Sequence, residues 1–152
     1  MRVIFLSDLH ITSTSSPVTS PWVQHFCNFI CSTSAEPTYI FVLGDIINGG
    51  DKLAFQTASK IFDYIKQQLQ HIDHHFFFLP GNHDYCDSAL NAFQQFVESH
   101  QSNVCPPFNF LTDKTWNVTI EDTNFIVTDS INGGKYNLPG RLDLSGIKRC
   151  AM

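Results

Sequence analysis

The stretch that most constrains the fold is residues 76–79. It consists of three phenylalanines and a leucine and is followed directly by Pro80. A short apolar run bounded by proline and glycine is typical of a buried strand. The turn that follows carries Asn82, His83 and Asp84, which are an amide, an imidazole and a carboxylate. In open α/β sheets, ligands bind just outside the carboxyl ends of the strands. The sequence therefore predicts that these three side chains lie where ligands bind.

Two earlier apolar runs end in the same way. Residues 2–6 lead to Asp8 and His10, and residues 38–43 lead to Asp45. If the strands lie parallel in one sheet, their carboxyl ends meet at one edge. We therefore expect a single site made of Asp8, His10, Asp45, Asn82, His83 and Asp84.

Each motif taken alone also has a structural explanation. Aspartate is common in turns and helix caps, and a glycine before it permits a positive φ. Asn82 and Asp84 could form a turn, Asp84 could cap a helix, and His83 could be a structural turn residue. A turn does not need a histidine between two turn formers, however. The presence of all three motifs in order after three strands favours the functional interpretation.

The segments between the predicted strands have the periodicity of amphipathic helices. Apolar residues recur at helical spacing over residues 22–34, 54–69 and 90–97, so each segment has one face that can cover a sheet. Later, apolar runs at 116–120 and 125–128 flank a short polar turn, which predicts a hairpin. We expect an α/β fold whose first half is a parallel sheet with right-handed crossovers. The hairpin would begin or extend a second sheet.

Three short blocks follow the predicted strands: Ser7-Asp8-Leu9-His10, Gly44-Asp45-Ile46 and Gly81-Asn82-His83-Asp84. They resemble the first three signature blocks of the calcineurin-like metallophosphoesterases. The resemblance covers nearly the whole chain and implies an α/β/β/α sandwich, in which two stacked mixed sheets are flanked by helices. It also implies a single domain over residues 1–152.

Within this family the chain looks most like the class III cyclic nucleotide phosphodiesterase branch. There the second block leads into a Gly-rich turn and a helix, as Asn48-Gly49-Gly50-Asp51 does here. Further along, that branch has blocks similar to Thr128-Asp129-Ser130 and Gly140-Arg141-Leu142. The resemblance implies a phosphoester substrate, most simply a small phosphodiester. A cyclic nucleotide, a glycerophosphodiester and another phosphoester all stay open at this point.

The resemblance also implies a centre of two divalent or mixed-valence transition metals. Asp45 would bridge them, Asp8 and His10 would hold the first metal, and the carbonyl oxygen of Asn82 would bind the second. Mixed oxygen and imidazole ligation suits Mn, Fe or Zn better than Ca. Such a pair hydrolyses phosphoesters by neutralising the phosphate oxygens and generating a metal-bound hydroxide as the nucleophile.

Two further residues have implied catalytic roles. His83 corresponds to a family histidine that is not a ligand and that stabilises the transition state or protonates the leaving oxygen. Asp84 would fix the tautomer of His83, as a second carboxylate does for many catalytic imidazoles.

The chain also departs from the family pattern. The family completes its metal shells with later histidines, whereas no histidine follows His100 here. We expect either the N-terminal portion of a longer enzyme, or a short member with an incomplete second sheet. In both cases we expect this chain alone to bind metal weakly at Asp8, His10 and Asp45 and to turn over slowly or not at all. The alternative function is a binding scaffold of this fold without catalysis, although a scaffold has no need for the whole motif set.

Charge and cysteine content bound the partners and the compartment. The net charge of −5 argues against a broad nucleic-acid or acidic-membrane surface, because both require a basic field. No apolar run approaches the ~18 residues of a membrane helix. The five cysteines are an odd number and form no zinc-binding spacing. Cys27 and Cys31 lie four residues apart on a predicted helix face, where free thiols behave as small apolar residues, so a reduced, cytoplasmic location is expected. The oligomeric state is open.

Overall fold

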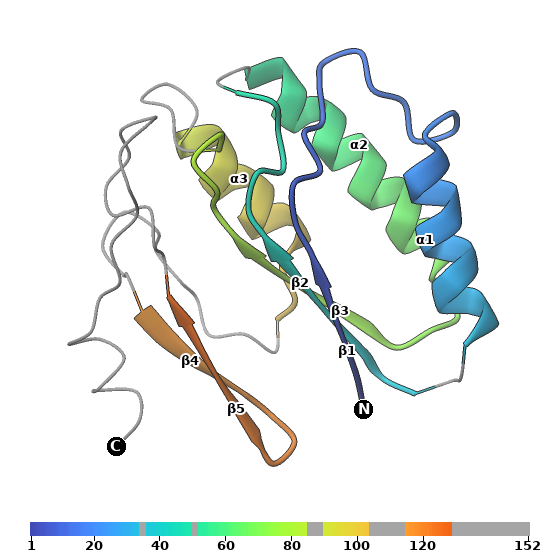
Figure 1. Cartoon of the computed structure of the whole chain (residues 1–152), viewed down its shortest axis with the longest axis vertical. Helices are drawn as coiled ribbons and strands as arrows, with labels where there is room; N and C mark the ends of the chain where they lie inside the picture. The colour runs from blue at the N-terminus through green and yellow to red at the C-terminus, as the bar shows by residue number, and fades with distance from the viewer. Residues whose placement is uncertain (34–35, 50–51, 85–89, 104–114, 129–152) are drawn as a thin grey trace.

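The computed structural model describes residues 1–33, 36–49, 52–84, 90–103 and 115–128 (Figure 1). No helix in these ranges is long and apolar enough to cross a membrane. The Gly-rich and C-terminal segments of the branch resemblance, including Arg141, lie largely outside the described residues. In chain order the elements are β1 (Arg2–Leu6), α1 (Pro21–Ser32), β2 (Thr38–Leu43), α2 (Lys52–Gln68), β3 (His74–Leu79), α3 (Leu90–His100), β4 (Thr115–Ile120) and β5 (Thr123–Thr128).

The first sheet has the order β1-β2-β3, and all its strands are parallel, as predicted. Helix α1 connects β1 to β2, and α2 connects β2 to β3, because parallel neighbours require a crossover rather than a tight turn. In the register of the sheet, Leu6 lies opposite Val42, and Leu43 lies opposite Leu79. The three strands therefore end at nearly the same level, and the loops that follow them start side by side.

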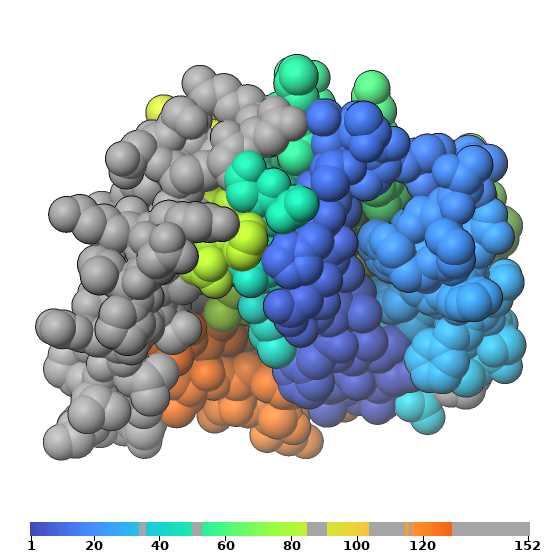
Figure 2. All heavy atoms as spheres, turned by 45° about the horizontal axis from the view of Figure 1, so that its top comes forward, coloured from blue at the N-terminus to red at the C-terminus, as the bar shows by residue number. Residues whose placement is uncertain are grey.

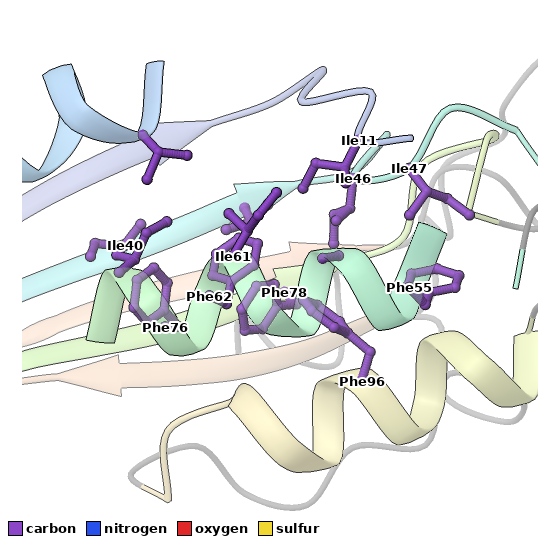
Figure 3. Close-up of a cluster of buried hydrophobic side chains, with 14 of the residues drawn as sticks. Ile11, Ile40, Ile46, Ile47, Phe55, Ile61, Phe62, Phe76, Phe78 and Phe96 are labelled. Atoms are coloured by element: carbon purple, nitrogen blue, oxygen red, sulfur yellow. The ribbon is translucent and has the colours of Figure 1, made fainter. Parts of the chain in front are cut away.

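One face of this sheet packs against the helices through a core rich in phenylalanine (Figure 3). Phe62 of α2 is fully buried, and its ring lies 5.4 Å from that of Phe76 and 5.1 Å from that of Phe78 in nearly perpendicular pairs. The ring centroid of Phe96 of α3 lies 5.5 Å from that of Phe62 and 5.0 Å from that of Phe78. Burying one such side chain contributes about 1.5–3 kcal/mol. The apolar helix faces predicted from the sequence are therefore the faces that pack on the sheet.

The other face of the sheet packs against the β4–β5 hairpin. Phe41 and Phe77 stack with their ring centroids 4.8 Å apart, and Val118, Ile120 and Val127 of the hairpin join them in a second buried cluster. The described residues thus form helix, sheet and hairpin layers, in agreement with the expected sandwich. Within these residues the first sheet is purely parallel and the second is an antiparallel pair, with the helices on one side.

Three strand boundaries differ from the prediction. Strand β4 begins at Thr115 instead of Trp116, because Thr115 pairs with Thr128 of β5. Strand β3 begins at His74 instead of Phe76, because His74 and His75 pair in register with Thr38 and Tyr39 of β2. The hairpin turn is also shorter than the predicted 121–124, since β5 begins at Thr123 and pairs with Ile120. Glu121 has a φ of 51°, and a positive φ in the turn suits the twist of a two-residue hairpin.

Candidate metal centre

The loops that follow β1, β2 and β3 meet at the carboxyl edge of the parallel sheet. Figure 2 brings this edge forward and shows the three segments side by side, in blue, turquoise and yellow-green. The first two loops are joined by backbone hydrogen bonds, in which Asp8 N–H donates to Gly44 O at 3.2 Å and His10 N–H donates to Asp45 O at 3.0 Å. Ile11 then forms a parallel bridge with Ile47. The predicted convergence of the first two motifs is therefore present in the fold.

The backbone of this edge adopts an unusual conformation at three non-glycine residues. The φ angles are 57° at Asp8, 45° at His10 and 51° at Asp45, all in the left-handed region. Such a conformation costs on the order of 1–3 kcal/mol at each residue and persists only where the surroundings enforce it. Aspartate and histidine tolerate it better than most residues. The three candidate ligands of the first two loops are thus held in conformations that cluster at functional sites.

The same three side chains form a group that could hold a metal ion. One possible ligand atom from each of Asp8, His10 and Asp45 lies within 4.8 Å of the others. His10 Nε2 is 3.9 Å from Asp8 Oδ1, and both side chains are open to solvent. Two carboxylates with one imidazole form a donor set suited to Mn, Fe or Zn. Within the described part of the chain, no other group of three or more histidine, cysteine, aspartate or glutamate side chains meets this geometry.

The turn after β3 packs directly against the loop after β2. A Cβ added at Gly81 would lie 2.1 Å from both the backbone nitrogen and Oδ1 of Asp45, and a Cβ at Gly44 would lie 2.5 Å from the nitrogen of Gly81. Gly44 also has a φ of 96°, which favours glycine. Only residues without a side chain allow the two backbones to approach this closely.

This close approach puts the third motif beside Asp45. The backbone N–H of His83 donates to Asp45 Oδ1 at 2.9 Å. The His83 ring lies edge-on to the His10 ring, with their centroids 4.8 Å apart. Asn82 is half-buried in the same turn, between Gly81 and His83. All three motifs therefore reach one edge, while the individual roles assigned to these residues remain predictions.

Asp84 occupies a position that the sequence did not predict. Its carboxylate is fully buried and accepts hydrogen bonds from the backbone N–H groups of Gly81, Ile46 and Ile47 at 2.8, 3.2 and 3.0 Å. Burial raises the pKa of Asp84 to about 6 and outweighs these three hydrogen bonds, which lower it; the nearby charge of Asp45 adds to the rise. The carboxylate thus joins two loops, and the expected action on the tautomer of His83 remains a prediction.

A second set of imidazoles precedes and begins β3, at the opposite end of the sheet. His74 Nδ1 pairs with the carbonyl oxygen of Ile72 at 2.7 Å, and His75 Nε2 lies 3.1 Å from Asp73 Oδ1. These contacts are local to the start of the strand. Such contacts are typical of a strand entry.

A comparison with protein families decides the assignment of the chain. The family model for calcineurin-like phosphoesterases matches residues 1–148. The chain belongs to the calcineurin-like phosphoesterase family. No curated protein and no solved structure matched the chain in the corresponding searches.

The family assignment supports a hydrolase that acts on phosphoesters with the help of metal ions. The cluster of Asp8, His10 and Asp45 agrees with the divalent metals that calcineurin-like phosphoesterases typically bind. The residue match covers the ranges that carry all three motifs. The match therefore includes the segments between the motifs as well as the motifs themselves.

Gly81→Ala is expected to lower the free energy of unfolding by about 3 kcal/mol, because the new methyl group overlaps the backbone and carboxylate of Asp45. The same overlap should displace Asp45 and weaken metal binding. Urea denaturation measures the first effect, and Gln56→Ala, at an exposed position of α2, is the control. A Gly81→Ala chain as stable as the unchanged one would show that the loops do not approach as described.

Proposed function

We propose that the chain hydrolyses phosphodiesters at a centre of two divalent or mixed-valence transition metals. Asp8, His10, Asp45 and Asn82 would be the metal ligands, with Asp45 between the two ions. The observation that carries the proposal is the convergence of ligand atoms from Asp8, His10 and Asp45 within 4.8 Å. These residues come from two loops held in left-handed conformations, and the turn that bears Asn82 packs on one of the loops.

The donor set limits the metals to those that accept both oxygen and imidazole, and Mn, Fe and Zn all meet this condition. Two such ions would neutralise the phosphate oxygens and lower the pKa of a water molecule. The N–H of His83 donates to Asp45 Oδ1, a hydrogen bond that would hold the Asp45 carboxylate in position for the ions. The acidic net charge of −5 leaves the bound cations as the main attraction for an anionic substrate.

His83 is the proposed proton donor to the leaving oxygen. The centroid of its ring lies 4.8 Å from that of the His10 ring. His83 is therefore next to a proposed metal ligand, but it is not one of the three clustered donors. A general acid must reach the leaving group from beside the metals, and histidine is the side chain most often used for this step. The geometry therefore supports this role for His83.

The substrate is proposed to be a small phosphodiester, with a cyclic nucleotide as the first class to test. The support is the likeness of the motifs and of the Asn48-Gly49 turn to the class III cyclic nucleotide phosphodiesterase branch. A cytoplasmic location is proposed on the thiol chemistry, since Cys27 and Cys31 are free cysteines four residues apart in α1.

Hydrolysis of bis(4-nitrophenyl) phosphate tests this function. The purified chain should release 4-nitrophenol slowly after Mn²⁺ is added, lose this activity in EDTA, and act still more slowly on the monoester 4-nitrophenyl phosphate. Release that continues in EDTA would contradict metal dependence. Faster release from the monoester would contradict the choice of a diester substrate.

A further inference from the structure

The Asp84 carboxylate holds together backbone from two motif loops that are distant in sequence. Its Oδ2 accepts from Gly81 N–H in its own turn and from Ile46 N–H in the loop after β2. Its Oδ1 accepts from Ile47 N–H in that same loop. A buried carboxylate is costly unless it is well hydrogen-bonded, and charge-assisted hydrogen bonds of this kind are stronger than neutral ones. The group therefore strongly favours one relative position of the two loops.

The hydrogen bonds between these two loops run in both directions. Asp84 of the third motif accepts from the backbone of the second motif, and Asp45 of the second motif accepts from His83 N–H in the third. Gly81 lies against Asp45 at the point where a Cβ would overlap it. Two carboxylates and one close backbone contact thus fix the same pair of loops.

Two of the backbone amides that bond to Asp84 belong to sequence neighbours of proposed ligands. Ile46 immediately follows Asp45, and Gly81 immediately precedes Asn82. Any shift of the Asp84 carboxylate therefore moves the backbone beside both ligands. A metal site needs its ligands within a few tenths of an ångström of the productive geometry, which supporting hydrogen bonds provide.

We propose that Asp84 is a positioning residue that fixes the separation of Asp45 and Asn82 before metal binds. It acts through Ile46, Ile47 and Gly81 and touches neither metal nor substrate. The inference rests on the proposed function, because it takes Asp45 and Asn82 as ligands. It differs from an action on the His83 ring, which would change turnover and leave the affinity for metal unaltered.

Asp84→Asn and Asp84→Ala test the inference in the full chain, with Mn²⁺ affinity measured by electron paramagnetic resonance. An asparagine with its oxygen at the Oδ2 position keeps two of the three hydrogen bonds and turns its NH₂ group toward Ile47 N–H. Alanine keeps none. We expect Mn²⁺ affinity to fall about 10-fold in Asp84→Asn and about 100-fold in Asp84→Ala. This is the range observed when a residue that supports a metal ligand by hydrogen bonding is lost.

Amide hydrogen exchange, measured without metal, separates positioning from general unfolding. Faster exchange should be confined to residues 44–47 and 81–84 in Asp84→Asn, with strands β1–β3 still protected. Asp122→Asn, which removes one negative charge from the exposed hairpin turn, should change neither readout. If Asp84→Ala does not fold, Asp84→Asn decides the question alone.

The possible failures can be distinguished. Unchanged Mn²⁺ affinity in a folded Asp84→Asn overturns the positioning role, as does weaker binding accompanied by loss of amide protection throughout the sheet. If Asp84→Asn lowers turnover alone, the carboxylate acts on His83 and the positioning role is again wrong. If the unchanged chain binds no Mn²⁺, the proposed function itself fails and the inference fails with it.

Discussion

Asp45→Asn is expected to lower Mn²⁺ affinity by more than the ~10–100-fold that loss of an outer partner costs, because it removes charge from a direct ligand. The amide oxygen can still accept from His83 N–H, so the contact between the two loops should remain. Hydrolysis of bis(4-nitrophenyl) phosphate should fall by at least the same factor. The measurements are an electron paramagnetic resonance titration with Mn²⁺ and steady-state kinetics.

The matched control for this substitution is Asp63→Asn. It makes the same chemical change on α2, where the Asp63 side chain is 72% exposed. Asp63→Asn should bind Mn²⁺ and turn over substrate as the unchanged chain does. Equal Mn²⁺ affinity in Asp45→Asn and in the control would exclude Asp45 as a ligand.

His83→Gln is expected to lower kcat by about 10²–10⁴-fold, the usual contribution of a positioned general acid. Mn²⁺ affinity and KM should change little, since His83 is proposed to donate a proton and not to bind metal. Glutamine keeps the backbone N–H that bonds to Asp45, so the substitution removes the imidazole and leaves the loop contact. This separation of kcat from metal affinity distinguishes His83 from the ligands.

Leaving-group dependence sharpens the test of His83. Phenol leaves less readily than 4-nitrophenol, so diphenyl phosphate should depend more on a proton donor than bis(4-nitrophenyl) phosphate. The loss in His83→Gln should therefore be larger with diphenyl phosphate. An equal loss with both substrates would argue for stabilisation of the transition state without proton transfer. His25→Gln, at an exposed position of α1, is the control.

Much of the fold follows from local patterns in the sequence. Apolar runs bounded by turn formers predicted β1 and β2 with their observed ends. The apolar stripe of α2 predicted the face that packs on the sheet, as the burial of Ile61, Phe62 and Ile65 confirms. The start of β3 and the end of the hairpin turn were missed because pairing with a neighbouring strand, and not composition, sets them.

The candidate site was predictable as a set of residues, since parallel strands bring their carboxyl ends to one edge. The structure brings Asp8, His10 and Asp45 together as that argument requires. The sequence analysis did not predict that Gly44 and Gly81 are sterically required for the close approach of the two loops. Their only sequence signal is a glycine directly before Asp45 and before Asn82, which is also ordinary turn composition.

The sequence alone determined which chemical groups follow which strands, because strand and turn preferences act over a few residues. Only the tertiary structure decided what those groups touch. The carboxylate of Asp84 bonds to the amide of Ile46, 38 residues away, and Asp45 bonds back to His83 over the same separation. No local preference encodes such a contact, because it depends on the distance between two loops. That distance is set by the packing of the strands and by the close approach of two glycines.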